Sequence, residues 1–377
     1  MQTSFTKIAL AGAMAFAIAG GAYAQEQVVK IGVTGPLSGP NAFIGKDNEN
    51  GVRLAVEDLN AKKMVVGGKT LKFELASEDD QCDPKSGVSV AQKLVDGGVK
   101  FVMGPYCSGV AIPASRIYSE GNVVVSTVGS NPKVTMGGYK NLFRIMAGDN
   151  EIGARLAFYA ANVLKVKNVA VIDDRTAYGQ GLVDEFSKEA KKLGLNIVAQ
   201  EFTTDKSTDF SAILTSLKAK NPDVILLGGY APQAGPMVRQ MKSLGINAKL
   251  MGGDAICTAE LGKLAGDAAT DTVLCAQGGV VLEKTAEGPA FKAKYKKRFN
   301  IDPDAYAPSF YDQTMFVGQS MQKADSVNPE KVGAEIYKTT YKGMSGTFAF
   351  DEKGNLKSAP ITVYTFKGGV PSALGAY

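Results

Sequence analysis

The segment KFVMGPYCSGVAIPASRIYSEGNVVVSTVGS, residues 100–130, decides the fold that we expect for this chain. It holds two short apolar runs, 101–103 and 123–125, with a helical pattern between them. Small polar residues follow each run, the first set including Ser108 and the second Ser130. This alternation predicts a βαβ unit with parallel strands. Because ligands of open parallel sheets bind beyond the carboxyl ends of the strands, both serines are candidate site residues.

The same alternation continues on both sides of this segment. Strands are predicted before it at 28–33 and 71–75, separated by a helix at 47–63. After residue 150 the pattern restarts, and its strand ends lie near Tyr178, at Tyr230 and at Asp254. The fold class is therefore α/β, with two doubly wound parallel sheets in series. Near the end of the chain, alternating runs at 346–350 and 361–366 predict a hairpin.

Composition narrows the classes of function. The 377 residues are 45% hydrophobic and 21% charged, which is typical of a globular protein with room for two domains. The formal charge of +5 is spread along the chain without a basic run interleaved with aromatics, so no nucleic-acid partner is expected. Histidine is absent, which excludes Ser-His-Asp and Cys-His catalysis and histidine-based metal sites. We expect neither a metal nor a cofactor.

The first 24 residues have the pattern of a secretory signal peptide. Lys7 supplies the positive charge, residues 8–19 are apolar, and Ala22-Tyr23-Ala24 fits the small-x-small cleavage rule. A membrane anchor is disfavoured because the apolar run is too short to cross a bilayer. We therefore expect an exported, soluble protein that begins at Gln25.

Export makes disulfides plausible, and four cysteines allow three pairings. Cys82 and Cys107 follow two strands that we expect to be neighbours, whereas Cys257 and Cys275 bracket one short helical pattern. These positions favour Cys82–Cys107 and Cys257–Cys275, each worth roughly 3 kcal/mol on the chain-entropy model. Buried free thiols remain the alternative. A zinc site is disfavoured because the spacing is not CxxC and histidine is absent.

Two such lobes facing each other would form a cleft, a preferred place for small ligands. Its residues could hold a zwitterion, with a carboxylate on Ser108, Ser130 and loop amides, and an ammonium on Asp254. Other interpretations are open: the serines could be ordinary turn residues and Asp254 a helix N-cap. The acidic pairs at 79–80 and 173–174 could indicate hydrolysis, although solvation or capping is the simpler role.

Six short motifs, taken together, resemble the periplasmic leucine/isoleucine/valine-binding proteins of ABC importers over essentially the whole mature chain. They are DDQCDP at 79–84, CS at 107–108 with PAS at 113–115, YGQGL at 178–182, GGY at 228–230, MGGD at 251–254 and DEKGNL at 351–356.

This resemblance implies the type I periplasmic-binding-protein fold, in which three crossover segments join the lobes. The crossovers should lie near Gly148, Gly279 and about Lys357. The N-terminal lobe would then comprise residues 25–147 and 279–356. The C-terminal lobe would comprise residues 148–278 and 357–377.

The resemblance also implies ligand roles. Ser108 matches a serine that binds the substrate carboxylate. Ser130 stands where the family usually has Thr, which contacts both ligand charges, and the carbonyl of Val128 would accept from the ammonium. Asp254 stands where the family usually has Glu. The remaining residues implied at the site are Tyr178 and Tyr230, which would close over the ligand, and Tyr106, Cys107, Gly129, Ile44 and Tyr306, which would line it.

Two of these residues depart from the family pattern, which often has Tyr at Ile44 and Phe at Tyr306. Cys257 and Cys275 have no counterpart in the best-known members. These departures concern which ligand side chain fits, whereas the charged site is retained.

The resulting hypothesis is a periplasmic, monomeric solute-binding protein, not an enzyme. It would carry an amino acid, with leucine, isoleucine or valine expected, to the membrane permease of an ABC importer. One alternative is a relative that binds amides, urea or aromatic acids, for which a carboxylate at Asp254 would have no use. An alternative of another class is a secreted enzyme that uses two carboxylates converging across the cleft.

Overall fold

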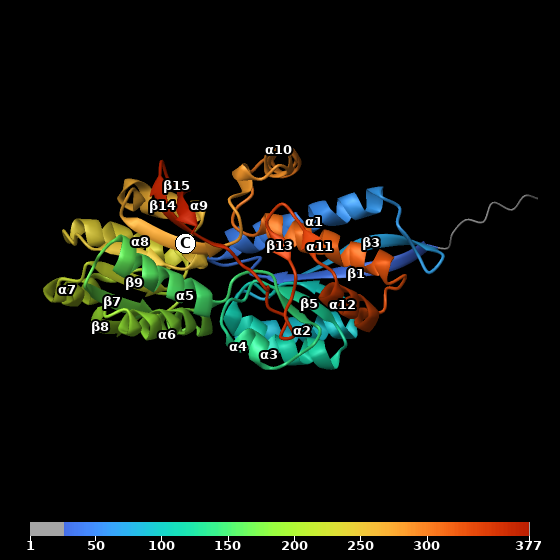
Figure 1. Ribbon diagram of the computed structural model, residues 1–377, viewed down its shortest axis with the longest axis horizontal. Helices are drawn as coiled ribbons and strands as arrows, with labels where there is room; N and C mark the ends of the chain where they lie inside the picture. Colours follow the sequence, from blue (N-terminus) through green and yellow to red (C-terminus); the bar gives the residue numbers. More distant parts are fainter. Residues whose placement is uncertain (1–25, 377) are drawn as a thin grey trace, which may run out of the picture.

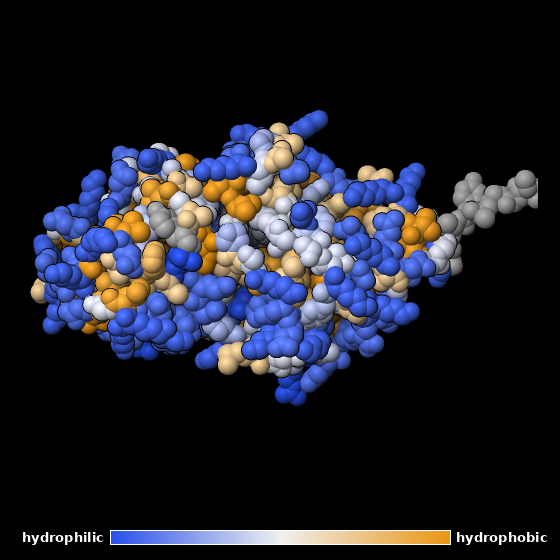
Figure 2. All heavy atoms as spheres, viewed as in Figure 1, coloured by the Kyte–Doolittle hydropathy of each residue, from blue (hydrophilic) through white to orange (hydrophobic). Residues whose placement is uncertain are grey.

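The computed structural model describes residues 26–376, which form two lobes placed end to end (Figure 1). The predicted signal peptide lies outside the described residues. No helix within 26–376 has both the length and the apolar character needed to cross a membrane. The face drawn in Figure 2 is largely hydrophilic, with apolar groups scattered over it.

The first lobe is built on a six-stranded sheet in the order β2-β3-β1-β4-β5-β6. All neighbours run parallel except β2, which is antiparallel to β3. Side chains of β4 alternate between two apolar clusters: Phe101 and Met103 pack on one face, and Val102 packs on the other. Burial of both faces explains why this strand is a continuous apolar run. The strands are β1 (Glu26–Gly35), β2 (Val65–Val66), β3 (Lys69–Asp79), β4 (Phe101–Met103), β5 (Val124–Thr127) and β6 (Leu142–Arg144).

Helices from both ends of the chain cover this sheet. Helix α2 begins as the sequence predicts, because the Asp83 carboxylate accepts a hydrogen bond from the Ser86 amide and Pro84 occupies the first turn. Helix α11 packs along α1, where Gly51 approaches Ala307 so closely that a Cβ would clash with its backbone. The helices of this lobe are α1 (Ala42–Ala61), α2 (Pro84–Asp96), α3 (Ser108–Glu120), α4 (Lys133–Met136), α10 (Gly288–Phe299), α11 (Ala307–Lys323) and α12 (Pro329–Lys338).

The second lobe contains a seven-stranded sheet in the order β15-β14-β11-β10-β9-β7-β8. Its strands from the middle of the chain are parallel, and β14 and β15 add antiparallel at one edge. Figure 1 shows these last two strands in the lobe formed mainly by the middle of the chain. The strands are β7 (Asn168–Asp173), β8 (Asn196–Phe202), β9 (Val224–Gly228), β10 (Lys249–Gly252), β11 (Val273–Gly278), β14 (Ile361–Lys367) and β15 (Val370–Ala376). The helices are α5 (Asp149–Phe158), α6 (Ala177–Lys192), α7 (Ser211–Lys220), α8 (Ala231–Ser243) and α9 (Ala259–Ala265).

Three segments connect the two sheets, and they lie side by side. A Cβ on Gly278, at the end of β11, would lie 2.9 Å from the Ala147 amide that precedes α5. The next residue, Gly279, donates its amide to the Pro360 carbonyl over 2.9 Å, just before β14. A narrow waist of three adjacent strands of chain is a geometry in which small torsional changes can rotate one lobe against the other.

Two sequence expectations about local structure are wrong. Segment 346–350 does not pair with 361–366: β13 (Thr347–Phe348) pairs with β12 (Tyr341–Lys342), and β14 pairs with β11 and β15. The alternation in both runs was visible, but partner choice depends on residues far away in sequence. The strands before Cys82 and Cys107 are not neighbours, because β1 separates β3 from β4.

Candidate functional site

One wall of the candidate site consists of the loops that follow β4 and β5 in the first lobe. Cys107 is the N-cap of α3, and Ser108 is its first helical residue. The Ser108 hydroxyl accepts a hydrogen bond from the Asn131 amide at 3.1 Å, which fixes the two loops to each other. Ser108 and Ser130 are each only 2% exposed. Because the first amides of a helix have no partner within it, the start of α3 offers donors for a carboxylate.

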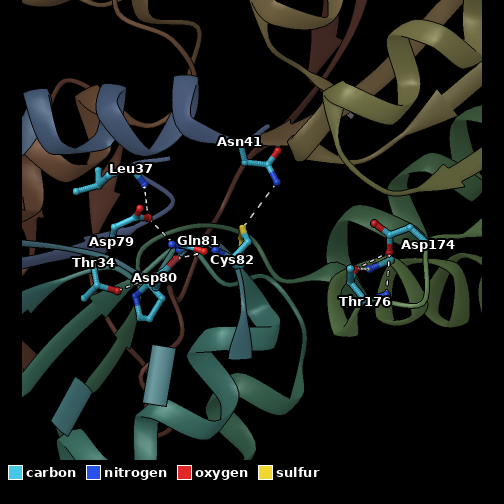
Figure 3. Close-up of a disulfide and its surroundings, with 12 residues drawn as sticks. Thr34, Leu37, Asn41, Asp79, Asp80, Gln81, Cys82, Asp174 and Thr176 are labelled. Atoms are coloured by element: carbon cyan, nitrogen blue, oxygen red, sulfur yellow. Dashed lines mark hydrogen bonds between the residues drawn. A yellow bond between two sulfur atoms is a disulfide. The ribbon is translucent and has the colours of Figure 1, made fainter. Parts of the chain in front are cut away.

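The disulfide Cys82–Cys107 anchors this wall (Figure 3). Gln81 and Cys82 both have positive φ values, 55° and 57°, and so turn the chain sharply after β3. The buried Asp80 carboxylate stabilises that turn by accepting from Thr34 at 2.9 Å and from the Cys82 amide at 2.9 Å. The turn, and not neighbouring strands, therefore brings the cysteines together across the end of β1. The second predicted pair, Cys257–Cys275, is also a disulfide in this structure.

The facing wall is centred on Asp254, which begins a short 3-10 helix (Asp254–Ile256) after β10. Its carboxylate is 3% exposed and accepts two phenolic hydrogen bonds. Tyr178, from α6 of the same lobe, donates to Oδ1 at 3.2 Å, and Tyr306, from the first lobe, donates to Oδ2. Burial raises the pKa of Asp254, and these hydrogen bonds oppose that shift. A cation placed beside this buried acid would therefore stabilise its ionised form.

Four tyrosine rings pack against one another beside Asp254, and we call this cluster the aromatic chamber. Tyr106 lies 6.1 Å from Tyr230 and 5.9 Å from Tyr306, measured between ring centroids, and Tyr178 lies 5.1 Å from Tyr230. Each of these side chains is at most 6% exposed. The structure thus brings residues of both lobes into one aromatic chamber, although they are as far apart in sequence as 106 and 306.

The other predicted residues lie in or beside the same buried cluster. Ile44, on α1, is completely buried and belongs to the apolar cluster that contains the tyrosines, Cys107 and Val128. Gly129 lies between Val128 and Ser130, and its amide donates to the Thr127 hydroxyl at 2.9 Å. A bulkier residue would be crowded there, since a Cβ on Gly129 would come within 3.0 Å of Ala111.

Three residues that the sequence did not single out lie beside the candidate site. Asn131 links the lobes, because its side-chain amide donates to the Ala177 carbonyl at 2.6 Å. Arg144 is 4% exposed and donates to the carbonyls of Ser130, at 2.8 Å, and Asn131, at 3.0 Å. Asp149 is completely buried at the start of α5. An Asn after a turn serine and an acid at a helix start are ordinary local features, so no sequence signal marked them.

A cavity of about 740 Å³ opens between the lobes and reaches this chamber at Cys107 and Tyr230. Figure 3 shows its two sides, with Cys82 and Asn41 on the first lobe and Asp174 and Thr176 across the opening. Burial raises the pKa of Asp174 to about 6. A small molecule in this cavity would contact Tyr230, at the edge of the aromatic chamber.

The sequence profile that describes periplasmic binding proteins matches residues 28–370. This chain belongs to the periplasmic binding protein family. A curated relative, the Leu/Ile/Val-binding protein homolog 1 of Brucella abortus, is 35% identical to this periplasmic binding protein over 98% of the chain and 97% of its own length. The resemblance inferred from the motifs is therefore confirmed.

Solved structures of periplasmic binding proteins have the same architecture as this one. A leucine-binding protein from Thermotoga maritima superposes with a TM-score of 0.85 at 27% identity, covering 92% of this chain and 98% of its own. A branched-chain amino acid transporter substrate-binding protein from Streptococcus pneumoniae, in complex with isoleucine, gives a TM-score of 0.83 at 26% identity, with 93% and 99% covered. The predicted type I fold is confirmed.

Proposed function

We propose that this periplasmic binding protein captures a free amino acid with a branched aliphatic side chain and presents it to the permease of an ABC importer. The observation that carries the proposal is the buried Asp254 carboxylate, which accepts one phenolic hydrogen bond from each lobe. Acidic and donor-rich groups on opposite walls match the two charges of a zwitterion. The named ligands of the relatives, leucine, isoleucine and valine, are consistent with this assignment.

The ligand carboxylate would lie against the first wall. The Ser108 hydroxyl, the Ser130 hydroxyl and the first amides of α3 supply donors at one place. Hydrogen bonds from neutral donors to a carboxylate are short and strong when the surroundings exclude water. The partial positive charge at the start of a 13-residue helix adds to the attraction.

The ligand ammonium would lie against Asp254 and the Val128 carbonyl. Each Asp254 oxygen already accepts a hydrogen bond from one phenol, and a carboxylate oxygen can accept a second hydrogen bond. The ionised form of Asp254, which burial disfavours, becomes favourable once the ammonium is in place. The aliphatic side chain would then contact the tyrosines and Ile44, whose burial supplies the apolar part of the affinity.

Closure and delivery follow from the two-lobed form. Residues that contact one ligand come from both lobes, so the ligand stabilises the closed arrangement by bridging them. The three adjacent crossover segments supply the hinge. The closed surface, in the periplasm, is the form that the permease would recognise.

A relative that binds amides, urea or aromatic acids is the first alternative. Such ligands lack an ammonium, and a buried carboxylate without a cation carries a desolvation cost that they would not offset. The buried position of Asp254 therefore favours an amino acid over these ligands.

A secreted hydrolase is the alternative of another class, since a second acid, Asp149, has its pKa raised first by burial and then by the charge of Asp254. The relatives are named for binding, so we assign both acids to holding a ligand. Incubation with leucinamide separates the two roles. A hydrolase would release leucine above a protein-free control, whereas a binding protein would return the amide unchanged.

Calorimetric titration with leucine, isoleucine and valine tests the proposal. We expect the wild type to bind at least one of them, and Asp254→Asn to lose at least about 1.5 kcal/mol, or roughly tenfold in affinity. Asp312→Asn is the matched control, because Asp312 is as deeply buried, at 2% exposed, but accepts hydrogen bonds from Ser345 within the first lobe. If none of the three amino acids binds and an amide or aromatic acid does, the proposed ligand class is wrong. An Asp254→Asn affinity within about threefold of wild type would overturn the ammonium assignment.

A further inference from the structure

Asp149 is a buried acid whose carboxylate has no hydrogen-bond partner among residues 26–376. It is completely buried, and neither carboxylate oxygen accepts a hydrogen bond within the described residues. The Ser130 hydroxyl is near enough to favour the ionised form without meeting hydrogen-bond geometry. Buried carboxylates without donors are rare because each carries a desolvation cost. Such a group calls for a functional explanation.

The position of Asp149 is fixed from both lobes. Its amide donates to the Ser130 carbonyl of the first lobe at 2.8 Å, which holds the acid beside a residue of the serine-bearing wall. On the other side, a Cβ on Gly181 of α6 would lie 3.3 Å from Asp149 Oδ2. The carboxylate thus lies where the loop after β5 meets the start of α6, which also carries Tyr178.

Arg144 does not satisfy this acid. Its guanidinium donates to the Ser130 and Asn131 carbonyls and to the Asn355 side chain, at 2.8, 3.0 and 2.6 Å. Its Nε has no acceptor within residues 26–376. Arg144 therefore places a positive charge nearby, but its hydrogen bonds hold the loop that carries Ser130.

We propose that Asp149 is a second ligand-binding carboxylate, and that Asp149 and Asp254 together hold the ligand ammonium. The inference rests on the proposed function, since it supplies a further contact for the amino acid. The geometry favours it because Asp254 already accepts from two phenols, whereas both Asp149 oxygens are free to accept from an ammonium. An ammonium has three donors, enough to reach both acids and a hydroxyl or carbonyl of the Ser130 loop.

The pair of acids should release a proton when the ligand binds. Burial and the charge of Asp254 raise the pKa of Asp149 well above its ordinary value. Asp149 and Asp254 are both buried and interact electrostatically, so we expect the pair to retain a proton when no cation is beside them. An arriving ammonium lowers the pKa of the pair and displaces that proton, so binding becomes tighter as the pH rises. The charged and titratable groups facing Asp149 are Arg144 of β6, Asp254, Glu185 and Tyr178 of α6, and Tyr230.

The experiment compares two ligands that differ only in the amino group, leucine and 4-methylpentanoate, by calorimetry on wild type and Asp149→Asn. We expect Asp149→Asn to weaken the affinity for leucine at least about tenfold. The affinity for 4-methylpentanoate should stay within about threefold of the wild-type value. Asp312→Asn again serves as the control, with both affinities unchanged. Equal losses for the two ligands would show that Asp149 only supports the fold, and would overturn the proposal, as would an unchanged leucine affinity.

If Asp149→Asn does not fold, proton release by Asp254→Asn decides the question, because Asp149 is then the acid that remains beside the ammonium. Leucine is titrated near pH 6 in two buffers of different ionisation enthalpy. Release of up to one proton per leucine, declining as the pH is raised, supports the role of Asp149, and no release at any pH overturns it. A wild type that binds no amino acid would instead overturn the proposed function, so the two failures are distinguishable.

Discussion

The two walls of the cleft offer different kinds of donors and acceptors. The first-lobe wall presents backbone amides and two hydroxyls at the start of α3 and in the loop after β5. The second-lobe wall presents side chains, namely Asp254 with Tyr178 and Tyr230 beside it. Backbone groups are positioned by the fold itself, whereas side chains are positioned by their neighbours. The first wall should therefore tolerate substitutions that the second does not.

Each wall also has its own disulfide, and these provide the largest expected effect. Cys82–Cys107 and Cys257–Cys275 close loops of 25 and 18 residues. Replacing either pair by serines should lower the free energy of unfolding by roughly 3 kcal/mol, measured by urea denaturation, and the two losses should differ by only about 0.3 kcal/mol on the chain-entropy model.

Removal of the two disulfides should have different effects on ligand affinity, although the effects on stability are nearly equal. Cys257 directly follows the 3-10 helix that begins at Asp254, so loss of its bond loosens a side-chain contact. Loss of the bond at Cys107 leaves the amides of α3 in place, because the helix orients them. Calorimetry should show the greater loss of amino-acid affinity in the Cys257→Ser/Cys275→Ser variant. The reverse order would contradict the division between the walls.

The two phenols on Asp254 give the next prediction, because one comes from each lobe. Tyr306 donates from the first lobe and Tyr178 from the second. A hydrogen bond to a charged group contributes about 1.5–3 kcal/mol. Tyr306→Phe should therefore shift the ligand-free protein toward the open form by roughly tenfold or more, whereas Tyr178→Phe should not.

Small-angle scattering of the ligand-free variants measures this shift, with a larger radius of gyration expected only for Tyr306→Phe. Tyr178→Phe is the matched control, since it removes the same group from the same acid without removing a contact between lobes. Equal radii for the two variants would show that the Tyr306 hydroxyl does not hold the lobes together.

The sequence predicts those residues of the candidate site whose placement depends on local pattern. Ser108, Ser130, Tyr230 and Asp254 follow strand ends, and parallel strands bring such positions to one edge of each sheet. Tyr306 came only from the family resemblance, since nothing near it in sequence marks it.

What the sequence missed depends on contacts between distant segments. Asp149 has the ordinary pattern of an acid at a helix start, and only its burial beside the Ser130 loop and α6 distinguishes it. The wrong hairpin has the same origin, because β14 pairs with β11 from the middle of the chain. Local periodicity predicts which residues form a strand but not which strand will be its partner.

The smallest effect is expected on the first wall. Ser108→Ala removes one hydroxyl but leaves the helix amides, so amino-acid affinity should fall by only about 0.5–1.5 kcal/mol, or roughly two- to tenfold. Ser115→Ala is the control on the same helix, because its hydroxyl donates to the Ala111 carbonyl within α3. Calorimetry should show unchanged affinity for this control. A hundredfold loss in Ser108→Ala would mean that the hydroxyl, and not the start of the helix, holds the carboxylate, and the contrast between the walls would fail.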